Sequence, residues 1–151
     1  LIDVAKKRAI DQNLKINYKV SDINNIKNKN TKFDIIISLE VIEHVADYKA
    51  FLNDMFSCLK KNGILIISTI NRNFFSYLST IIIAERILKI VPKDTHDWNK
   101  YIKPEEIVRC SEKRNIFLDK KSGLLPIPIG KNFKWIRINN VTSNYILSLI
   151  N

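Results

Sequence analysis

Glycine and cysteine are both scarce in this chain, and their scarcity excludes several kinds of site. The 151 residues include only three glycines, so the sequence contains no Gly-x-Gly-x-x-Gly pattern and no glycine-rich phosphate cradle. The two cysteines, Cys58 and Cys110, are too few and too far apart for a disulfide framework or a cysteine-based zinc site. Cys58 lies in an apolar helical pattern, which predicts a buried thiol in a reducing compartment.

Acidic residues are few relative to basic ones. The chain has 15 Asp and Glu against 25 Lys and Arg, a formal net charge of +10 and a pI of about 9.6. Such a balance is found in proteins that bind nucleic acid, anionic membranes or acidic ligands. The lysines are scattered, however, and adjacent ones form pairs at most, so we expect no nucleic-acid partner. The 46% hydrophobic content of a chain this long predicts one globular domain.

Long uncharged hydrophobic runs are also missing. The strongest candidate, Phe74–Val91, contains Glu85, Arg86 and Lys89 and is a poor transmembrane span. Its apolar residues form a stripe at helical spacing, and Pro92 ends the pattern. Two interpretations stay open: an amphipathic helix that lies on a membrane surface, and a helix that packs on a sheet or covers a pocket.

Helix and strand patterns alternate in the first part of the chain. Helices are expected at Leu1–Asn13 and Asp47–Lys61, the second with a basic last turn and a glycine after it. Strands are expected at Leu14–Val20, Phe33–Leu39 and Ile64–Ile70. The last two strands are apolar on both faces, which is typical of strands buried in a parallel sheet. This order predicts an α/β fold.

The remainder of the chain is richer in strand patterns. A helix is expected at Pro104–Lys113, because proline is favourable in a first turn and acidic residues follow it. Strand-like segments cover Ile116–Leu125, Phe133–Ile138 and Val141–Ile150. The Pro- and Gly-rich segment Pro126–Lys131 is expected to form a loop between the first two of them.

The densest set of chemical side chains follows the strand Phe33–Leu39. Glu40, Glu43 and His44 lie within five residues of one another at the end of this strand. Ligand groups in open α/β sheets lie just past the carboxyl ends of such strands. Two carboxylates and one imidazole could bind a divalent cation such as Mg²⁺, Mn²⁺ or Zn²⁺. The alternative is a core strand followed by an ordinary solvated helix start.

Two other polar segments are candidates for chemistry. The tip of the next strand reads Asn71-Arg72-Asn73, and a polar, aromatic-rich loop contains Thr95-His96-Asp97-Trp98.

Three stretches of the sequence carry a family resemblance. They are FDIIISLEVIEHV (residues 33–45), LKKNGILIISTINRN (59–73) and VPKDTHDWNKYIKPEE (91–106). In this order they resemble the ubiquinone-biosynthesis O-methyltransferases, which are class I S-adenosylmethionine-dependent enzymes. The resemblance implies a Rossmann-like α/β sheet with helices on both faces. It also implies that residues 1–151 are the C-terminal portion of a single domain that lacks its first two strands.

The resemblance also implies roles for individual residues. Glu40, Glu43 and His44 match the family's metal-binding residues, with Mg²⁺ as the expected ion. Leu39 matches a residue that contacts S-adenosylmethionine, and Asp22, at the end of the segment 14–20, is a second candidate for binding this cofactor. His96 is a candidate base or acceptor-orienting group, with a structural loop histidine as the alternative. A departure occurs at Leu125–Pro128, which replaces the family's usual sequence at the edge of the acceptor pocket.

Partners follow from the same resemblance. The implied substrate is a polyprenyl catechol or quinol, methylated on a phenolic oxygen. The enzyme would lie in the cytoplasm, peripherally on the inner face of the membrane, with Phe74–Val91 against an anionic surface. Without the first strands, apolar sheet edges would be exposed, so a complementing N-terminal fragment is an expected partner. The alternative is an inactive remnant that acts as a membrane-peripheral or interaction module.

Overall fold

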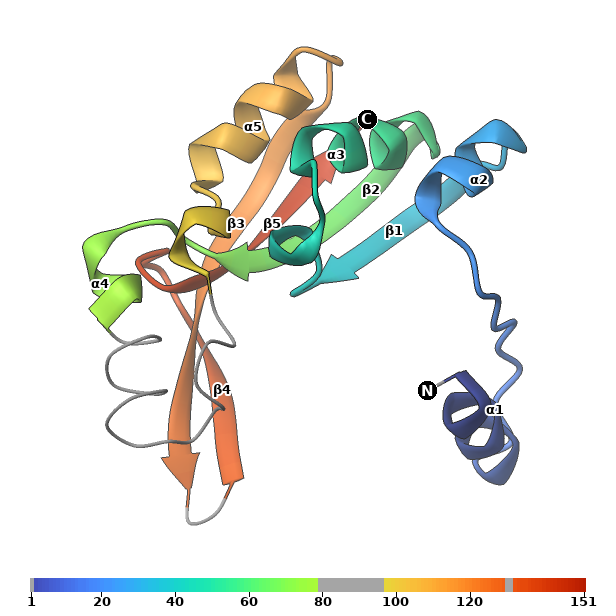
Figure 1. Ribbon diagram of the computed structural model, residues 1–151, viewed down its shortest axis with the longest axis horizontal. Coiled ribbons are helices and arrows are strands. Elements are labelled where there is room, and N and C mark those ends of the chain that lie inside the picture. The colour runs from blue at the N-terminus through green and yellow to red at the C-terminus, as the bar shows by residue number, and fades with distance from the viewer. Residues whose placement is uncertain (1, 79–96, 130–131) are drawn as a thin grey trace.

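A single mixed sheet forms the centre of the molecule. The computed structural model describes residues 2–78, 97–129 and 132–151 (Figure 1). The strand order is β1-β2-β5-β3-β4. The bounds are Phe33–Leu39 for β1, Leu59–Ile70 for β2, Phe117–Ile129 for β3, Asn132–Ile138 for β4 and Asn144–Ile150 for β5. The pair β1–β2 is parallel and the other pairs are antiparallel, so the expected α/β class is confirmed.

The helix between the two parallel strands is shorter than the sequence predicts. Helix α3 spans Tyr48–Ser57, and its N-cap Asp47 accepts hydrogen bonds from two backbone amides. The prediction that this helix reaches Lys61 is wrong, because Leu59 already pairs with Phe33 of β1. Gly63 therefore does not end the helix. It lies where β2 passes close to β1, and a Cβ there would stand 3.1 Å from the carbonyl oxygen of Phe33.

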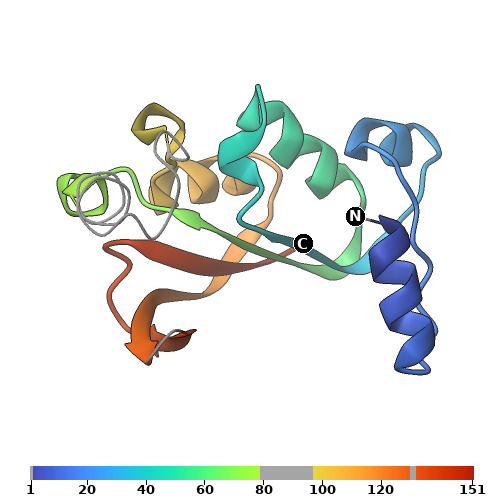
Figure 2. The same ribbon diagram turned by 60° about the horizontal axis from the view of Figure 1, so that its bottom comes forward.

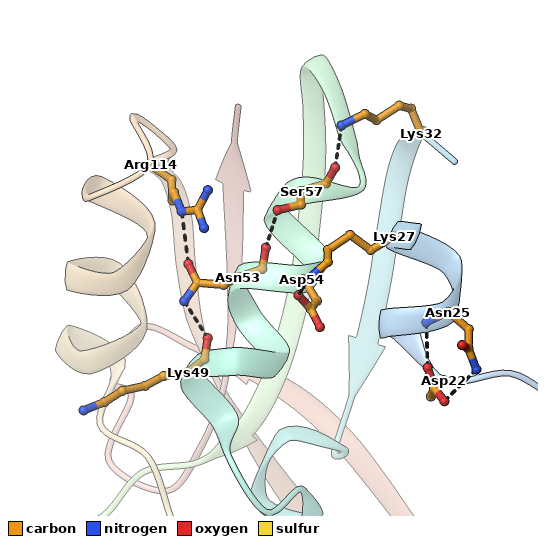
Figure 3. A network of polar contacts seen from close by, with 9 residues as sticks. All are labelled: Asp22, Asn25, Lys27, Lys32, Lys49, Asn53, Asp54, Ser57 and Arg114. Carbon is orange, nitrogen blue, oxygen red and sulfur yellow. Dashed lines mark hydrogen bonds and ion pairs between the residues drawn. The ribbon is translucent and has the colours of Figure 1, made fainter. Parts of the chain in front are cut away.

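Helices cover one face of the sheet. Helices α2 (Ile23–Asn28), α3 and α5 (Pro104–Glu112) lie on the same side in Figure 2. Alternate residues of β2 and β5 point into this layer and are fully buried: Leu65, Ile67, Thr69, Tyr145, Leu147 and Leu149. Polar contacts join the helices at their outer surface. Lys27 of α2 forms an ion pair with Asp54 of α3. Arg114, which follows α5, donates a hydrogen bond to Asn53 of α3 (Figure 3).

The opposite face of β1 and β2 is open in the described part of the chain. Ile35, Ile37 and Leu39 of β1 are 55%, 62% and 50% exposed, and their neighbours Ile64 and Ile66 are half-buried. The prediction that β1 is buried on both faces is therefore wrong for this structure. Among the described strands β1 pairs with β2 alone, so its other edge has no strand partner in the described part of the chain.

The N-terminal segment lies apart from the sheet. Helix α1 spans Ile2–Asp11, close to the expected bounds, and Figure 1 shows it separated from the strands. The predicted strand Leu14–Val20 is not formed, and its residues Ile16 and Val20 are exposed. A strand needs a hydrogen-bonding neighbour, and no described strand lies beside this segment.

The C-terminal half contains a long two-stranded hairpin. Helix α5 and the strands β3, β4 and β5 confirm the predicted elements. The expected loop Pro126–Lys131 is wrong for residues 126–129, which belong to β3, and residues 130–131 lie outside the described residues. Strand β3 continues through both prolines to Ile129 and pairs with β4 over that length. Gly123, where β3 pairs with both β4 and β5, has no room for a Cβ, which would stand 1.7 Å from the carbonyl oxygen of Asn140.

The predicted helix Phe74–Val91 is described only at its start. Helix α4 covers Phe74–Ser76 and begins with a capping box between Asn73 and Ser76. Residues 79–91 lie outside the described residues, so neither interpretation of this segment is tested. Among the described residues no helix is long and apolar enough to cross a membrane.

Candidate active site at the carboxyl ends of β1 and β2

The chain leaves β1 through a strained residue. Glu40 has a φ of 51°, in the left-handed region that a residue with a side chain adopts at a cost of about 1 kcal/mol. This conformation turns the chain sharply beyond Leu39, and the Glu40 amide donates to the carbonyl oxygen of Ser68 at 3.1 Å. Backbone strain of this kind gathers at functional sites, so it marks this strand end as a candidate.

The Glu40 carboxylate lies across the ends of two neighbouring strands. Ser68 Oγ of β2 donates to Glu40 Oε1 at 2.7 Å, and Asn144 Nδ2 of β5 donates to Glu40 Oε2 at 3.2 Å. Burial of the carboxylate raises the pKa of Glu40, and the nearby Glu43 raises it further, while the two hydrogen bonds and His44 oppose the shift. Glu40 as a residue remains exposed. The result is an accessible acid in a fixed orientation.

Glu43 has a different environment from Glu40. It lies in the short 3-10 helix η1 (Ile42–His44) and is buried, and its Oε2 accepts a 2.7 Å hydrogen bond from Thr69 Oγ1. His44 points outward with 63% of its side chain exposed, and its Nε2 lies 4.0 Å from Glu43 Oε1. Glu40 and Glu43 are therefore held by adjacent residues of β2 that face opposite sides of the sheet.

These side chains do not form a metal site in the described structure. No group of three or more His, Cys, Asp or Glu side chains that could hold a metal ion is found among the described residues. Glu43 is already hydrogen-bonded in the interior, and only Glu40 and His44 are exposed. The geometry therefore does not fit the three-ligand divalent cation that Glu40, Glu43 and His44 suggested.

The polar side chains that follow β2 form hydrogen bonds and an ion pair with other segments of the chain. Asn71 Nδ2 donates to the carbonyl oxygen of Val141 at 2.8 Å, and Asn73 Nδ2 donates to that of Thr142. Arg72 Nη2 donates to both carboxylate oxygens of Glu106 in α5, at 2.8 and 2.9 Å. These contacts tie the loop before β5 and the start of α5 to the end of β2.

The second polar segment is described in part. Thr95 and His96 lie outside the described residues, so the role predicted for His96 stays a prediction. Asp97 caps the 3-10 helix η3 (Trp98–Lys100) by accepting from the amide of Asn99 at 3.0 Å. Trp98 donates its indole N–H to the carbonyl oxygen of Asn73, which brings this loop to the tip of β2.

The two residues expected to bind S-adenosylmethionine differ in their availability. Leu39 is exposed at the carboxyl end of β1, next to the free edge, where an apolar cofactor contact fits. Asp22 caps α2: its Oδ1 accepts from the Asn25 amide at 2.7 Å and its Oδ2 from the Asn25 side chain (Figure 3). Leu39 is therefore accessible to a ligand, whereas the Asp22 carboxylate is already used in capping α2, and the cofactor roles of both residues stay predictions.

The supporting residues Ser68, Thr69 and Asn144 received no role from the sequence. A signal was present, because Ser68 and Thr69 are the two polar residues in the otherwise apolar run Ile64–Ile70. Ser38, the residue before the last one of β1, is a further unusual residue. Its hydroxyl is buried and, in the part of the chain that the structure describes, has no hydrogen-bond partner. Such orphan groups call for an explanation and occur at functional sites.

Solved structures define the class of fold. A magnesium protoporphyrin IX methyltransferase from Synechocystis PCC 6803 aligns with a TM-score of 0.63 at 14% identity, over 99% of this chain and 59% of that one. An S-adenosylmethionine-dependent methyltransferase from Clostridium acetobutylicum aligns with a TM-score of 0.62 at 16% identity, over 98% of this chain and 70% of that one. The fold is that of the class I methyltransferases, as the resemblance implied.

Sequence relatives narrow the assignment. The profile described as a methyltransferase domain matches residues 2–117, so the chain belongs to the methyltransferase-domain family. Proteins named ubiquinone biosynthesis O-methyltransferase match most of it. The one from Pelagibacter ubique is 41% identical over 99% of this chain, and the one from Rickettsia prowazekii is 40% identical over 98%. The chain spans 61% and 58% of the length of these relatives.

Proposed function

We propose that this chain carries the acceptor side of an S-adenosylmethionine-dependent O-methyltransferase. The substrate would be a phenolic hydroxyl of a polyprenylated catechol or demethylubiquinol in ubiquinone biosynthesis. Two observations support the proposal. Relatives with about two-fifths sequence identity carry the name of this activity, and the accessible Glu40 carboxylate is fixed by hydrogen bonds from Ser68 and Asn144. The carboxylate carries the argument, because it is an exposed acid at the ligand-binding end of a class I methyltransferase sheet.

The chemistry asks little of the protein beyond position and proton transfer. Bound S-adenosylmethionine supplies a methyl group on a sulfonium sulfur. The acceptor oxygen forms the new O–C bond as the S–C bond breaks, and the phenolic proton leaves to a base. Glu40 is suited to orient the hydroxyl and accept that proton, because two donors fix its carboxylate and burial raises its pKa. No step is assigned to a metal.

The donor side requires additional polypeptide in this proposal. Within residues 2–78, 97–129 and 132–151, the outer edge of β1 has no strand partner, and Ile35, Ile37 and Leu39 form an apolar surface beside it. An edge of this kind pairs readily with another strand. The complementing fragment would add a strand to β1 and cover this surface. An acceptor with a polyprenyl tail resides in the bilayer, so the assembled enzyme would work at the cytoplasmic membrane face.

A methyl-transfer assay tests the proposal directly. The acceptor would be a short-chain prenyl catechol, and the chain would be tested alone and after co-expression with the part of the Pelagibacter ubique relative that it does not match. We expect turnover only in the complemented sample, and a large loss of kcat in Glu40→Gln. Absence of turnover in a folded, stoichiometric complex would overturn the proposal and favour the inactive remnant.

Binding of S-adenosylmethionine separates the two halves of the site. We expect weak or undetectable binding to the chain alone, because the described residues supply one side of the donor site. Ile37→Lys should prevent complementation, since it places a charge in the contact surface, whereas Ile16→Lys on the separate N-terminal segment serves as a matched exposed control. Micromolar cofactor binding by the chain alone would contradict the two-part donor site.

A further inference from the structure

An asparagine–glycine pair lies in the irregular first part of β2. While β1 advances from Phe33 to Ile35, its partner β2 advances from Leu59 to Ile64, so β2 contains extra residues there, and Asn62-Gly63 is among them. Asn62 is exposed and has a φ of 62°, in the left-handed region that asparagine adopts more readily than most residues. Its side-chain amide makes no hydrogen bond within residues 2–78, 97–129 and 132–151, so it is free to react.

The residue that follows distinguishes Asn62 from the other asparagines in similar positions. Three of them share its exposure and its left-handed φ: Asn13, Asn30 and Asn115. Leucine, threonine and isoleucine follow these three, whereas Gly63 follows Asn62 and is the one glycine of the sequence that comes after an asparagine. A glycine has no Cβ beside its backbone nitrogen and is the least restricted in φ and ψ. The Gly63 nitrogen is therefore the least obstructed of the four.

We propose that Asn62-Gly63 is a site of spontaneous deamidation. The backbone nitrogen of Gly63 attacks Cγ of Asn62 and forms a new N–C bond. The bond from Cγ to Nδ2 breaks, the proton of the Gly63 amide passes to the departing nitrogen, and ammonia leaves. Solvent water then opens the cyclic imide at either of its carbonyl carbons. One opening gives aspartate at position 62, and the other gives isoaspartate, in which the main chain runs through the former side-chain carbon.

The two products differ in their effect on the sheet. The Asn62 amide donates to the carbonyl oxygen of Asn151 at 2.8 Å, and the Asn151 amide donates to that of Gly63 at 3.0 Å. Gly63 is tightly enclosed, since a Cβ there would stand 2.9 Å from the carbonyl oxygen of Lys60 and 3.2 Å from that of Asp34. Isoaspartate lengthens the main chain just before Gly63 and disturbs these contacts. Aspartate adds a charge and leaves the main chain unchanged.

Ageing of the folded chain tests the proposal without any assay of methyl transfer. The chain would be incubated in mildly alkaline buffer, and peptide mapping by mass spectrometry would follow the exchange of ammonia for water at each asparagine. We expect Asn62 to react at least about tenfold faster than Asn13, Asn30 and Asn115, the ratio that a barrier lower by about 1.4 kcal/mol produces. Equal rates at the four positions, or reaction of Asn62 in urea but not in the folded chain, would overturn the proposal.

Urea denaturation of the separated products tests the effect on the sheet. Ion-exchange chromatography resolves them from the starting chain, because each has gained a negative charge. We expect the isoaspartate form to unfold at a lower urea concentration than the starting chain, and Asn62→Asp to unfold close to it. Asn30→Asp is the matched control, since it adds the same charge at an exposed left-handed position that glycine does not follow. Equal midpoints for the isoaspartate form and Asn62→Asp would overturn the inferred disturbance at Gly63.

Discussion

The two faces of the sheet have almost the same apolar character and opposite surroundings. On the covered face, Leu65 and Ile67 are fully buried beneath α3 and α5. On the open face, Ile35 and Ile37 of the neighbouring strand are more than half exposed. Side chains of successive residues alternate between these faces. The sequence of β1 and β2 is therefore suited to a sheet covered on both sides, while the described chain covers one.

The comparison also separates the two acids of the candidate site. Glu43 lies on the covered side and is bonded to Thr69, whereas Glu40 lies toward the open side and is bonded to Ser68 and Asn144. Thr69 and Ser68 are adjacent in β2, so one strand end supports one structural and one accessible carboxylate. The face on which each glutamate lies therefore decides whether its carboxylate is buried or accessible to a ligand.

The largest expected difference between the faces is in core packing. Ile67→Ala should lower the free energy of unfolding by about 2–5 kcal/mol, because it leaves a cavity in a fully buried layer. Ile37→Ala should change it by about 0.5 kcal/mol or less, because that side chain is exposed in this chain. Urea denaturation measures both. Equal costs would show that the open face is covered in solution, and a dependence on protein concentration would identify self-association as the reason.

The next difference concerns the hydrogen bonds of the two acids. Thr69→Val should destabilise the chain by about 1–3 kcal/mol, since it leaves the buried Glu43 carboxylate without its donor. Ser68→Ala should cost about 0.5–1 kcal/mol, because Glu40 keeps the Asn144 donor and contact with water. Thermal and urea unfolding of the two single variants provide the comparison. A larger cost for Ser68→Ala would mean that Glu40 is the more deeply enclosed acid.

Sequence patterns predicted several helices and strands well. The strand at Phe33–Leu39 and the helix beginning at Pro104 were found with little error, because apolar spacing and first-turn chemistry are local signals. The segment Leu14–Val20 failed for the opposite reason. Its alternation is a strand pattern, but a strand forms only beside a partner, and the partner is a property of the whole sheet.

The prolines of β3 led to a wrong prediction for the β3–β4 hairpin. Pro126 and Pro128 lie within β3, where the sequence predicted a loop. Beyond Leu124 this strand has β4 as its single described neighbour, so a residue without an N–H is tolerated wherever its nitrogen faces outward. Which strands lie at an edge cannot be seen in the local sequence, so this error could not have been avoided.

The end of the strand β1 lies where the sequence predicts it, but the predicted convergence of the side chains beyond it is not found among the described residues. The strand end with Glu40, Glu43 and His44 is where the sequence placed it. Convergence of the three side chains was an inference from spacing. It failed because the left-handed turn at Glu40 and the burial of Glu43 send the two carboxylates to different partners. Spacing along the chain does not determine the direction of a side chain after an irregular turn.

Magnesium titration tests that geometry. We expect Mg²⁺ to bind weakly, with a dissociation constant on the order of millimolar or above, because one exposed carboxylate is a poor ligand set. Glu40→Gln should abolish the residual binding, and Glu43→Gln should leave it unchanged. Isothermal titration calorimetry would measure it. Micromolar binding that requires both Glu43 and His44 would show that Glu43 leaves Thr69 to form the metal site expected from the sequence.

The smallest expected effect is the contribution of Glu40 to the pH dependence of the unfolding free energy. Burial raises the pKa of this carboxyl above its ordinary value of 4.5 in the folded chain. The folded state therefore holds the proton more tightly than the unfolded state does. The resulting stabilisation is complete below the unfolded pKa and is lost as the pH rises through the folded pKa.

Glu40→Gln removes the titrating group and isolates this contribution. The difference in unfolding free energy between wild type and Glu40→Gln should change with pH from about 4.5 upward and become constant once Glu40 is ionised in both states. Urea denaturation across that range, with Asp97→Asn as a control for a capping acid, measures it. A constant difference at all pH values would mean that the carboxylate is as well solvated in the fold as in the unfolded chain. In that case the open side of the strand end would be open to water at Glu40 itself, and the proton-accepting role would depend on the acceptor or the complementing segment to enclose it.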